Sequence, residues 1–227
     1  MVKEELNQKS PLRKLEAITG GGVGTGNIGV IASKEGIGKT AYLVHLSVDS
    51  LLRDKHVIHV SFDKKLDYIS SWYEDIFSEI SKKRDLESAM EVHDDIIKNR
   101  IIMNFNHNYP IHRIMDGLTA MIDSGQNGTD LVIIDGYDFN RGAIKDIEII
   151  KAFAEEKKVE VWFSDTLYPN SEDEDGVPKN LNPFMNNIQT VLTLGFQEET
   201  LKLSVVSHDS KRNDSSLQLD PKTLLIC

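Results

Sequence analysis

The sequence has almost no cysteine, no long apolar run and no recognisable export signal. Cys227 is the only cysteine among 227 residues, so no internal disulfide can form and a reducing cytosol is expected. No apolar stretch approaches the roughly 20 residues that a membrane-spanning helix needs. Met1 to Lys14 is mixed and charged rather than basic and then apolar. We therefore expect a soluble cytoplasmic protein with no membrane partner.

Positive charge is also scarce. The chain carries 26 Lys and Arg against 36 Asp and Glu, which gives a formal net charge of −10. A nucleic-acid-binding protein ordinarily needs a positive surface that replaces the counterions on phosphates. The two short basic clusters, Lys82–Arg84 and Lys157–Lys158, are typical of solvated helix surfaces. Nucleic acid is therefore a disfavoured partner, whereas a protein partner is compatible with this charge.

The length and the hydrophobic content of 40% fit one large domain with a sizeable core. We predict a polar N-terminal arm over residues 1–17 and a single domain over residues 18–227. Within the domain, short apolar runs typical of buried strands alternate with segments of helical periodicity. Strands are predicted at 27–32, 56–62, 100–105, 131–134 and 159–164. Helices are predicted at 40–54, 110–124 and 144–158, and two helices are predicted within 66–99.

This alternation predicts an α/β fold with a mostly parallel sheet covered by helices on both faces, a three-layer α/β/α sandwich. Three further strands, at 191–194, 201–206 and 217–219, are expected to close the sheet in antiparallel orientation. In open α/β sheets the ligand binds at the carboxyl ends of the strands. Polar residues that follow the predicted strands are Ser33 to Thr40, Asp63, Asp135 and Ser164-Asp165.

The run from Ser33 to Thr40 matches the phosphate-binding loop pattern G-x-x-x-x-G-K-[ST] between a strand and a helix, except that serine replaces the first glycine. Glycines let the backbone turn its N–H groups around phosphate oxygens, and the following helix directs its positive end at the same anion. Lys39 would neutralise the β- and γ-phosphates. The loop residues expected to bind ATP are Glu35, Gly36, Ile37, Gly38, Lys39, Thr40 and Ala41.

A second acidic strand end supports a Mg²⁺ site. Asp135 follows the apolar run Leu131 to Ile134, 95 residues beyond Thr40. A carboxylate at that position can hold the hydration shell of a Mg²⁺ ion beside nucleotide phosphates, while the Thr40 hydroxyl ligates the same ion. ATP and Mg²⁺ are the cofactors that these residues predict.

The motifs resemble one branch of the RecA-like P-loop ATPases, that of KaiC, RadA and DnaB. The glycine-rich run from Gly20 to Ala32 resembles the segment that precedes the phosphate loop there, and His59-Val60-Ser61-Phe62-Asp63 resembles the strand that ends in the branch's catalytic acid. The tail, with Lys211-Arg212-Asn213 and then Leu219-Asp220-Pro221, resembles the last hairpin more loosely. The resemblance covers roughly residues 18–225.

The resemblance implies a RecA-like ATP-binding domain that hydrolyses ATP as a homo-oligomer, for example a hexamer, with the nucleotide at a subunit interface. Asp63 and Lys39 would be the catalytic residues, with Asp63 activating the attacking water. Arg212 would reach the nucleotide of a neighbouring subunit, and Ser164 or Asp165 would act as a polar sensor. Two departures bear on hydrolysis: Asp63 replaces the usual glutamate, and Lys211 and Arg212 are adjacent rather than spaced as Lys-x-Arg.

Alternative functions follow from the same residues. A nucleotide-dependent switch or scaffold with weak hydrolysis, similar to KaiC-type regulators or to the ParA/MinD branch, fits the shorter Asp63 and the acidic charge. A DNA-handling helicase or recombinase is the other alternative. A dinucleotide site at Gly22 to Gly26 is rejected because the glycines precede a strand rather than follow one. The seven histidines lack the short paired spacings of zinc ligands.

Overall fold

A computed structural model describes residues 10, 12–62, 64–82, 89–124, 128–169, 171–173, 176–209, 211–213 and 215–225. Its centre is a nine-stranded sheet in the order β3-β2-β4-β5-β1-β6-β7-β8, with β9 also paired to β7. The strands are β1 (Ile28–Ser33), β2 (Val57–Phe62), β3 (Arg100–Phe105), β4 (Leu131–Asp135), β5 (Glu160–Thr166), β6 (Thr190–Gln197), β7 (Thr200–His208), β8 (Lys211–Arg212) and β9 (Ser216–Leu219).

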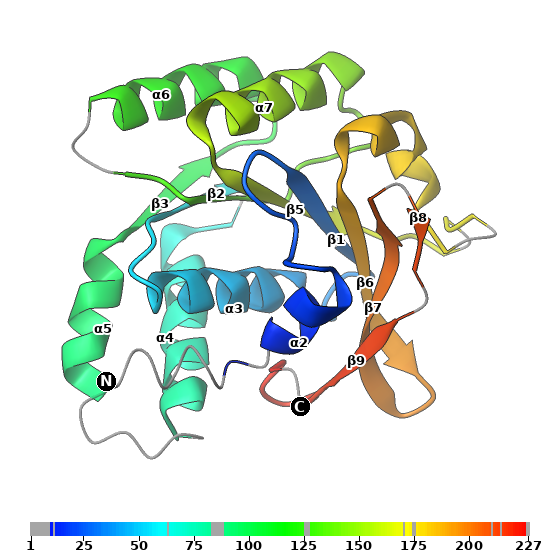
Figure 1. Ribbon diagram of the computed structural model, residues 1–227, viewed down its shortest axis with the longest axis horizontal. Coiled ribbons are helices and arrows are strands. Elements are labelled where there is room, and N and C mark those ends of the chain that lie inside the picture. Colours follow the sequence, from blue (N-terminus) through cyan, green and yellow to red (C-terminus); the bar gives the residue numbers. More distant parts are fainter. Residues whose placement is uncertain are drawn as a thin grey trace.

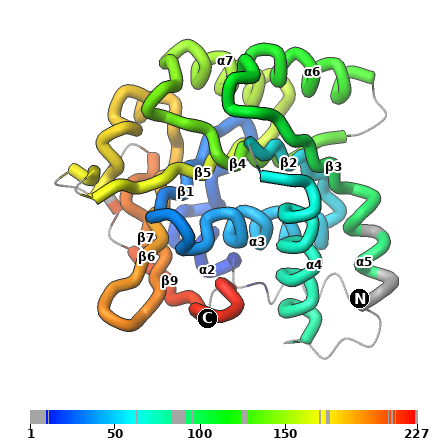
Figure 2. The backbone as a smooth tube through the Cα atoms, turned by 180° about the vertical axis from the view of Figure 1, so that it is seen from behind, coloured from blue at the N-terminus to red at the C-terminus, as the bar shows by residue number. Residues whose placement is uncertain are grey.

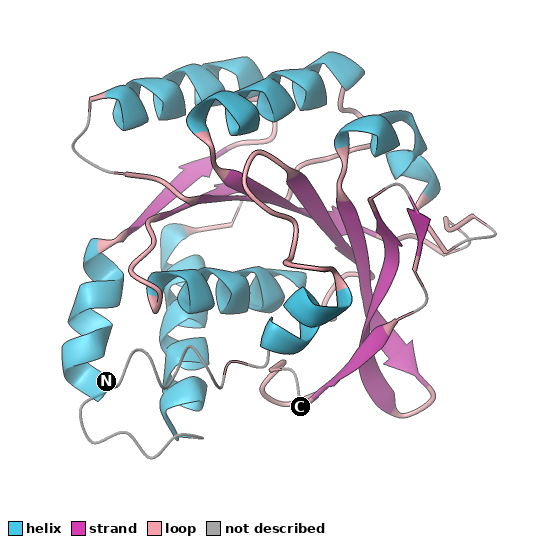
Figure 3. Cartoon of the chain, viewed as in Figure 1, coloured by secondary structure: helices cyan, strands magenta, loops and turns pink. Residues whose placement is uncertain are grey.

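Helices cover both faces of this sheet (Figures 1 and 3). One face carries α2 (Leu12–Ile18), α3 (Lys39–Leu51), α4 (Leu66–Lys82) and α5 (Ala89–Lys98), and the other carries α6 (Ile111–Asp123), α7 (Ile144–Lys157) and the 3-10 helix η1 (Lys179–Asn187). The view from behind shows the same two layers on either side of the strands (Figure 2). The α/β class, the mostly parallel sheet and the helices on both faces agree with the sequence prediction.

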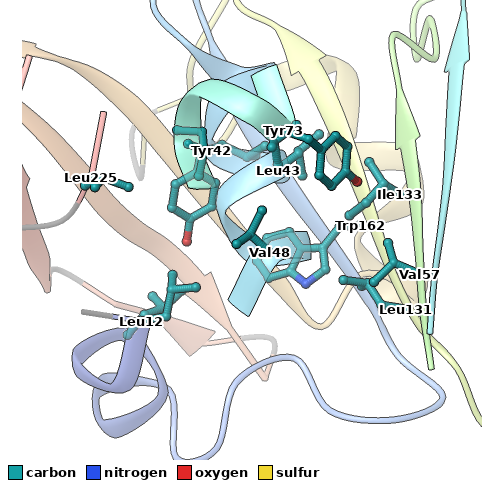
Figure 4. Packing of buried hydrophobic residues seen from close by; sticks show 14 of the residues in the cluster. Leu12, Tyr42, Leu43, Val48, Val57, Tyr73, Leu131, Ile133, Trp162 and Leu225 are labelled. Carbon is teal, nitrogen blue, oxygen red and sulfur yellow. The ribbon is translucent and has the colours of Figure 1, made fainter. Parts of the chain in front are cut away.

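Two hydrophobic clusters fill the spaces between the sheet and its helices. The first joins α3 and α4 to one face, with Val48 and Tyr73 packed among strand residues such as Ile133 (Figure 4). The second joins α6, α7 and η1 to the other face and contains Ile150 and Phe163. Every residue of β1, β2 and β4 is buried, as expected for parallel strands covered on both sides.

The direction of β6 differs from the sequence prediction. The predicted closing strand at 191–194 was expected to be antiparallel, but β6 runs parallel to β1 and is antiparallel only to β7. The physical reason is the segment before it: η1 crosses one face of the sheet and buries Leu181 and Phe184 in the second cluster. This crossover returns the chain to the end where β1 begins, as parallel pairing requires. The strands β7 and β9 do pair antiparallel, as predicted.

The helix α2 attaches the start of the described chain to the domain. Leu12 and Leu15 are buried in the first hydrophobic cluster. An ion cluster ties α2 to α3: Arg13 and Arg53 both contact the Asp49 carboxylate, and Arg53 also lies 2.8 Å from Glu16. Burial alone would raise the pKa of Asp49, but the two arginines hold that pKa below its ordinary value.

Asp49→Ala is expected to lower the free energy of unfolding by about 2 kcal/mol, because it removes a carboxylate that is 3% exposed and leaves two arginines without their buried partner. Urea denaturation at neutral pH measures this loss. Glu16→Ala removes a more exposed partner of the same arginines and should cost less than about 1 kcal/mol. Equal effects of the two substitutions would contradict a central role for Asp49.

None of the described helices combines the length and the apolar character that crossing a membrane requires.

Candidate functional site

The loop between β1 and α3 is shaped by two glycines. Gly36 and Gly38 have φ angles of 79° and 122°, values that residues with a Cβ rarely adopt. Gly38 is the N-cap of α3, and no side chain caps this helix start in the described structure. Residues 34–38 therefore curve around the positive end of α3 and leave its first N–H groups available to an anion.

Lys39 folds back over this loop. Its Nζ donates hydrogen bonds to the Ser33 carbonyl at 2.9 Å and to the Lys34 carbonyl at 3.3 Å, and it lies 3.4 Å from Ser33 Oγ. Burial, reinforced by the nearby positive charge of Lys64, lowers the pKa of Lys39 from its ordinary value. The negative charges of Asp135, Asp165 and Glu35 oppose this lowering only in part, and an anionic ligand in the loop would add to their effect.

The side chains of Thr40 and Asp135 meet at the end of the sheet. Thr40 Oγ1 donates a 2.8 Å hydrogen bond to Asp135 Oδ2, which joins the first turn of α3 to the last residue of β4. Ser164, in β5, donates a 2.6 Å hydrogen bond to Asp135 Oδ1 and accepts one of 2.8 Å from the Gly136 N–H. Asp135 is only 2% exposed, so these bonds fix the carboxylate in one orientation.

The arrangement fits a hard divalent cation. The hydroxyl of Thr40 and the carboxylate of Asp135 are oxygen donors, which Mg²⁺ prefers. Among the described residues no group of three or more His, Cys, Asp and Glu could hold a metal by itself. A usual Mg²⁺ site takes one or two protein oxygens together with phosphate oxygens and water.

Asp165 lies beside this group at the end of β5. Both of its carboxylate oxygens accept hydrogen bonds from the Asn180 amide, at 3.0 and 3.1 Å. Burial raises the pKa of Asp165 to about 6, and this effect outweighs the opposing hydrogen bonds and the positive charge of Lys39. The site thus contains a carboxyl group that changes its protonation near neutral pH.

These residues surround a cavity of about 580 Å³. Its lining includes the loop and polar residues Glu35, Gly36, Gly38, Lys39, Thr40, Lys64, Asp135, Asp138, Asn140, Ser164, Asp165 and Thr166, and aromatic side chains from Phe62, Tyr68, Trp72, His107, Tyr137 and Tyr168. The loop after β9 returns to this place and sets Leu224 against Gly38, where a Cβ would lie 2.6 Å from Leu224 Cδ1. This volume lies within the usual range of small-molecule and cofactor sites.

The structure brings together most of the residues that the sequence singled out. Glu35, Gly36, Gly38, Lys39, Thr40, Ala41 and Asp135 all line the cavity. Ile37 instead packs against the first hydrophobic cluster. Asp63 lies outside the described residues.

Arg212 is placed away from the cavity of its own chain. Its strand, β8, pairs with Ser207 and His208 of β7, and His208 in turn lies opposite Thr190, the first residue of β6. This is the end at which the parallel strands begin, whereas the glycine loop follows the other end of β1. A role of Arg212 in nucleotide binding therefore requires the site of a neighbouring subunit.

Sequence reasoning missed Lys64 and Asn180. Lys64 Nζ lies 2.6 Å from Thr40 Oγ1 and 3.8 Å from Asp135 Oδ2. The available signal was its position directly after Asp63, at the end of a strand that neighbours β4. Asn180 gave no comparable signal, because it follows a polar acidic segment and reaches Asp165 only through the packing of η1.

Neither protein-family models nor curated protein sequences match this chain.

Proposed function

We propose that this chain is a RecA-like P-loop protein that binds ATP together with Mg²⁺ and acts as an ATPase. The observation that carries the proposal is the 2.8 Å bond between Thr40 and Asp135, two residues that are 95 positions apart. If the glycine loop served only to cap α3, a buried carboxylate beside Thr40 would not be required. A cation site beside a phosphate loop needs this carboxylate and this hydroxyl.

Each residue has a defined part in binding. The N–H groups of the loop and the first turn of α3 would hold phosphate oxygens, and Lys39 would exchange its bonds with the Ser33 and Lys34 carbonyls for the β- and γ-phosphates. The Thr40 hydroxyl would ligate Mg²⁺ directly, and the Asp135 carboxylate would hold water of the ion's hydration shell. The bound ion supplies charge neutralisation at the phosphates. Ser164 keeps the Asp135 carboxylate turned toward Thr40.

Hydrolysis and assembly belong to the same proposal and rest on the resemblance in sequence. Asp63 would orient the attacking water, and the nucleotide would lie at an interface of a homo-oligomer, within reach of the neighbouring subunit's Arg212. Because the strand position of Arg212 is remote from the cavity of its own chain, this part of the proposal assigns Arg212 to the nucleotide of a neighbouring subunit.

Calorimetric titration of the purified protein with ATP and ADP, with and without Mg²⁺, tests the binding. We expect binding of both nucleotides in the presence of Mg²⁺. Absence of any binding would overturn the proposal. Phosphate release and light scattering in the same samples report turnover and assembly. Tight binding without phosphate release would favour the nucleotide-dependent switch over the ATPase.

A further inference from the structure

Lys64 occupies the place where the proposed Mg²⁺ ion would bind. It stands between β2 and α4, and its side chain reaches Thr40 and Asp135, the two residues assigned to the ion. Its Nζ lies 2.6 Å from Thr40 Oγ1 and 3.8 Å from Asp135 Oδ2. A primary ammonium between a hydroxyl and a carboxylate is itself a bound cation, supplied by the protein.

We propose that Lys64 is the resident cation of the nucleotide-free site and that Mg²⁺ displaces its ammonium onto the phosphates. This inference rests on the proposed function. It assigns to Lys64 a binding role that the sequence pattern does not contain. In the free protein Lys64 neutralises Asp135, and in the loaded protein it becomes a third cation for the nucleotide, beside Lys39 and Mg²⁺.

The displacement follows from the chemistry of Thr40 Oγ1. This hydroxyl has a single proton, which it donates to Asp135, so any cation must approach the lone pairs of its oxygen. Mg²⁺ binds oxygen at about 2.0–2.1 Å in near-octahedral geometry. An ammonium within hydrogen-bond distance of the same oxygen would occupy this side of the atom, and like charges repel. The two cations therefore exclude each other at Thr40.

The surroundings of Lys64 allow the side chain to move while its backbone stays in place. The Asn104 amide donates hydrogen bonds to the Lys64 carbonyl and, at 3.4 Å, to the Ser61 carbonyl, which ties this segment to β3. The Lys64 side chain is 41% exposed and lines the same cavity as Lys39. Once displaced from Asp135, its ammonium can reach phosphate oxygens bound in that cavity.

The test compares how strongly nucleotide affinity depends on Mg²⁺ in wild type and in Lys64→Met. Without Mg²⁺, Lys64 is the cation that partly replaces the ion, so the variant should bind ADP or a non-hydrolysable ATP analogue more weakly. With Mg²⁺, the variant loses the phosphate contact of Lys64, but the ion no longer has to compete with an ammonium at Thr40 and Asp135, so the two effects offset each other. We expect the ratio of Kd without Mg²⁺ to Kd with Mg²⁺ to rise at least about tenfold, which corresponds to 1.4 kcal/mol. Because each ratio is taken within one variant, a general loss of stability largely cancels.

Two further variants keep the test specific. Lys65→Met removes the adjacent lysine, which is exposed and is not among the residues that line the cavity, and should leave the ratio unchanged. Lys64→Arg keeps the positive charge and should largely restore the wild-type ratio.

Electron paramagnetic resonance with Mn²⁺ and no nucleotide adds a direct measurement of ion binding. In this measurement Lys64→Met should bind the ion about tenfold or more tightly than wild type.

The outcomes separate this inference from the function on which it rests. If wild type binds no nucleotide, the proposed function fails. If wild type binds nucleotide, and Lys64→Met shows the wild-type Mg²⁺ ratio and the wild-type Mn²⁺ affinity, Lys64 is not the resident cation and the ATP-binding assignment stands.

Discussion

Lys39→Ala is expected to weaken ATP affinity in the presence of Mg²⁺ by on the order of 100-fold. A hydrogen bond between charged groups contributes roughly 1.5–3 kcal/mol, and every 1.4 kcal/mol changes an equilibrium tenfold. In the free protein the ammonium already points into the loop, held by the carbonyls of Ser33 and Lys34. Little further ordering is then needed when phosphate arrives, so most of the interaction contributes to affinity.

The lowered pKa of Lys39 explains why this loss should appear in binding rather than in folding. Burial and the charge of Lys64 both disfavour the ammonium in the free protein. Removing it relieves this unfavourable burial, so the variant should remain folded. Thermal unfolding of the variant without nucleotide checks this directly.

Lys34→Ala is the matched control for Lys39→Ala. It removes an exposed lysine from the same loop, and this lysine is not among the residues that line the cavity. Calorimetric titration should show an affinity within about threefold of wild type for this control. Unchanged affinity in Lys39→Ala would show that the loop does not hold the phosphates.

The meeting of Thr40 and Asp135 could be predicted because it depends on topology alone. The carboxyl ends of parallel strands lie at one edge of a sheet, so a glycine loop after one strand and an aspartate after another are brought together. The runs from Ile28 to Ala32 and from Leu131 to Ile134 contain only apolar residues and one glycine, and they mark these two strands in the sequence. No knowledge of side-chain packing was needed for this part of the site.

The direction of β6 and the contacts of Lys64 and Asn180 could not be predicted in this way. The direction of β6 depends on how η1 crosses the sheet, which is decided by the burial of Leu181 and Phe184 rather than by strand periodicity. In the sequence Lys64 resembles an ordinary surface lysine, and only the structure shows its contacts with Thr40 and Asp135. Such contacts depend on side-chain geometry that spacing in the sequence does not encode.

Asp165 connects the stability of the protein to pH. Its pKa is raised by burial to about 6 from an ordinary value of 3.8. Between these two pH values the folded protein keeps the Asp165 proton and the unfolded chain releases it, so the free energy of unfolding falls as pH rises. Each pKa unit corresponds to about 1.4 kcal/mol, so the contribution of Asp165 declines by about 3 kcal/mol between pH 3 and pH 7.

Asp165→Asn should therefore stabilise the protein at pH 7 by about 2–3 kcal/mol, with a gain that shrinks as the pH falls from about 6 to about 4. The Asn180 amide can turn its oxygen toward the new side chain and keep a hydrogen bond. Urea denaturation across pH 4–8 measures the difference. Asp138→Asn removes a more exposed carboxylate of the same cavity, whose charge contributes less than burial to the raised pKa of Asp165, and as the control for net charge it should change the pH profile much less. Parallel pH profiles of wild type and Asp165→Asn would contradict the raised pKa.

Nucleotide binding should also change the protonation of Asp165. Phosphates placed beside Lys39 bring negative charge close to Asp165, which raises its pKa further and draws a proton from solution. Titrations near pH 6.5 in buffers of different ionisation enthalpy should show proton uptake with ATP in wild type and a smaller uptake in Asp165→Asn. Because the variant lacks this repulsion, it should also bind ATP more tightly at pH 7. Equal proton uptake in the two proteins would place the phosphates away from Asp165 and would count against the orientation of the nucleotide proposed for this cavity.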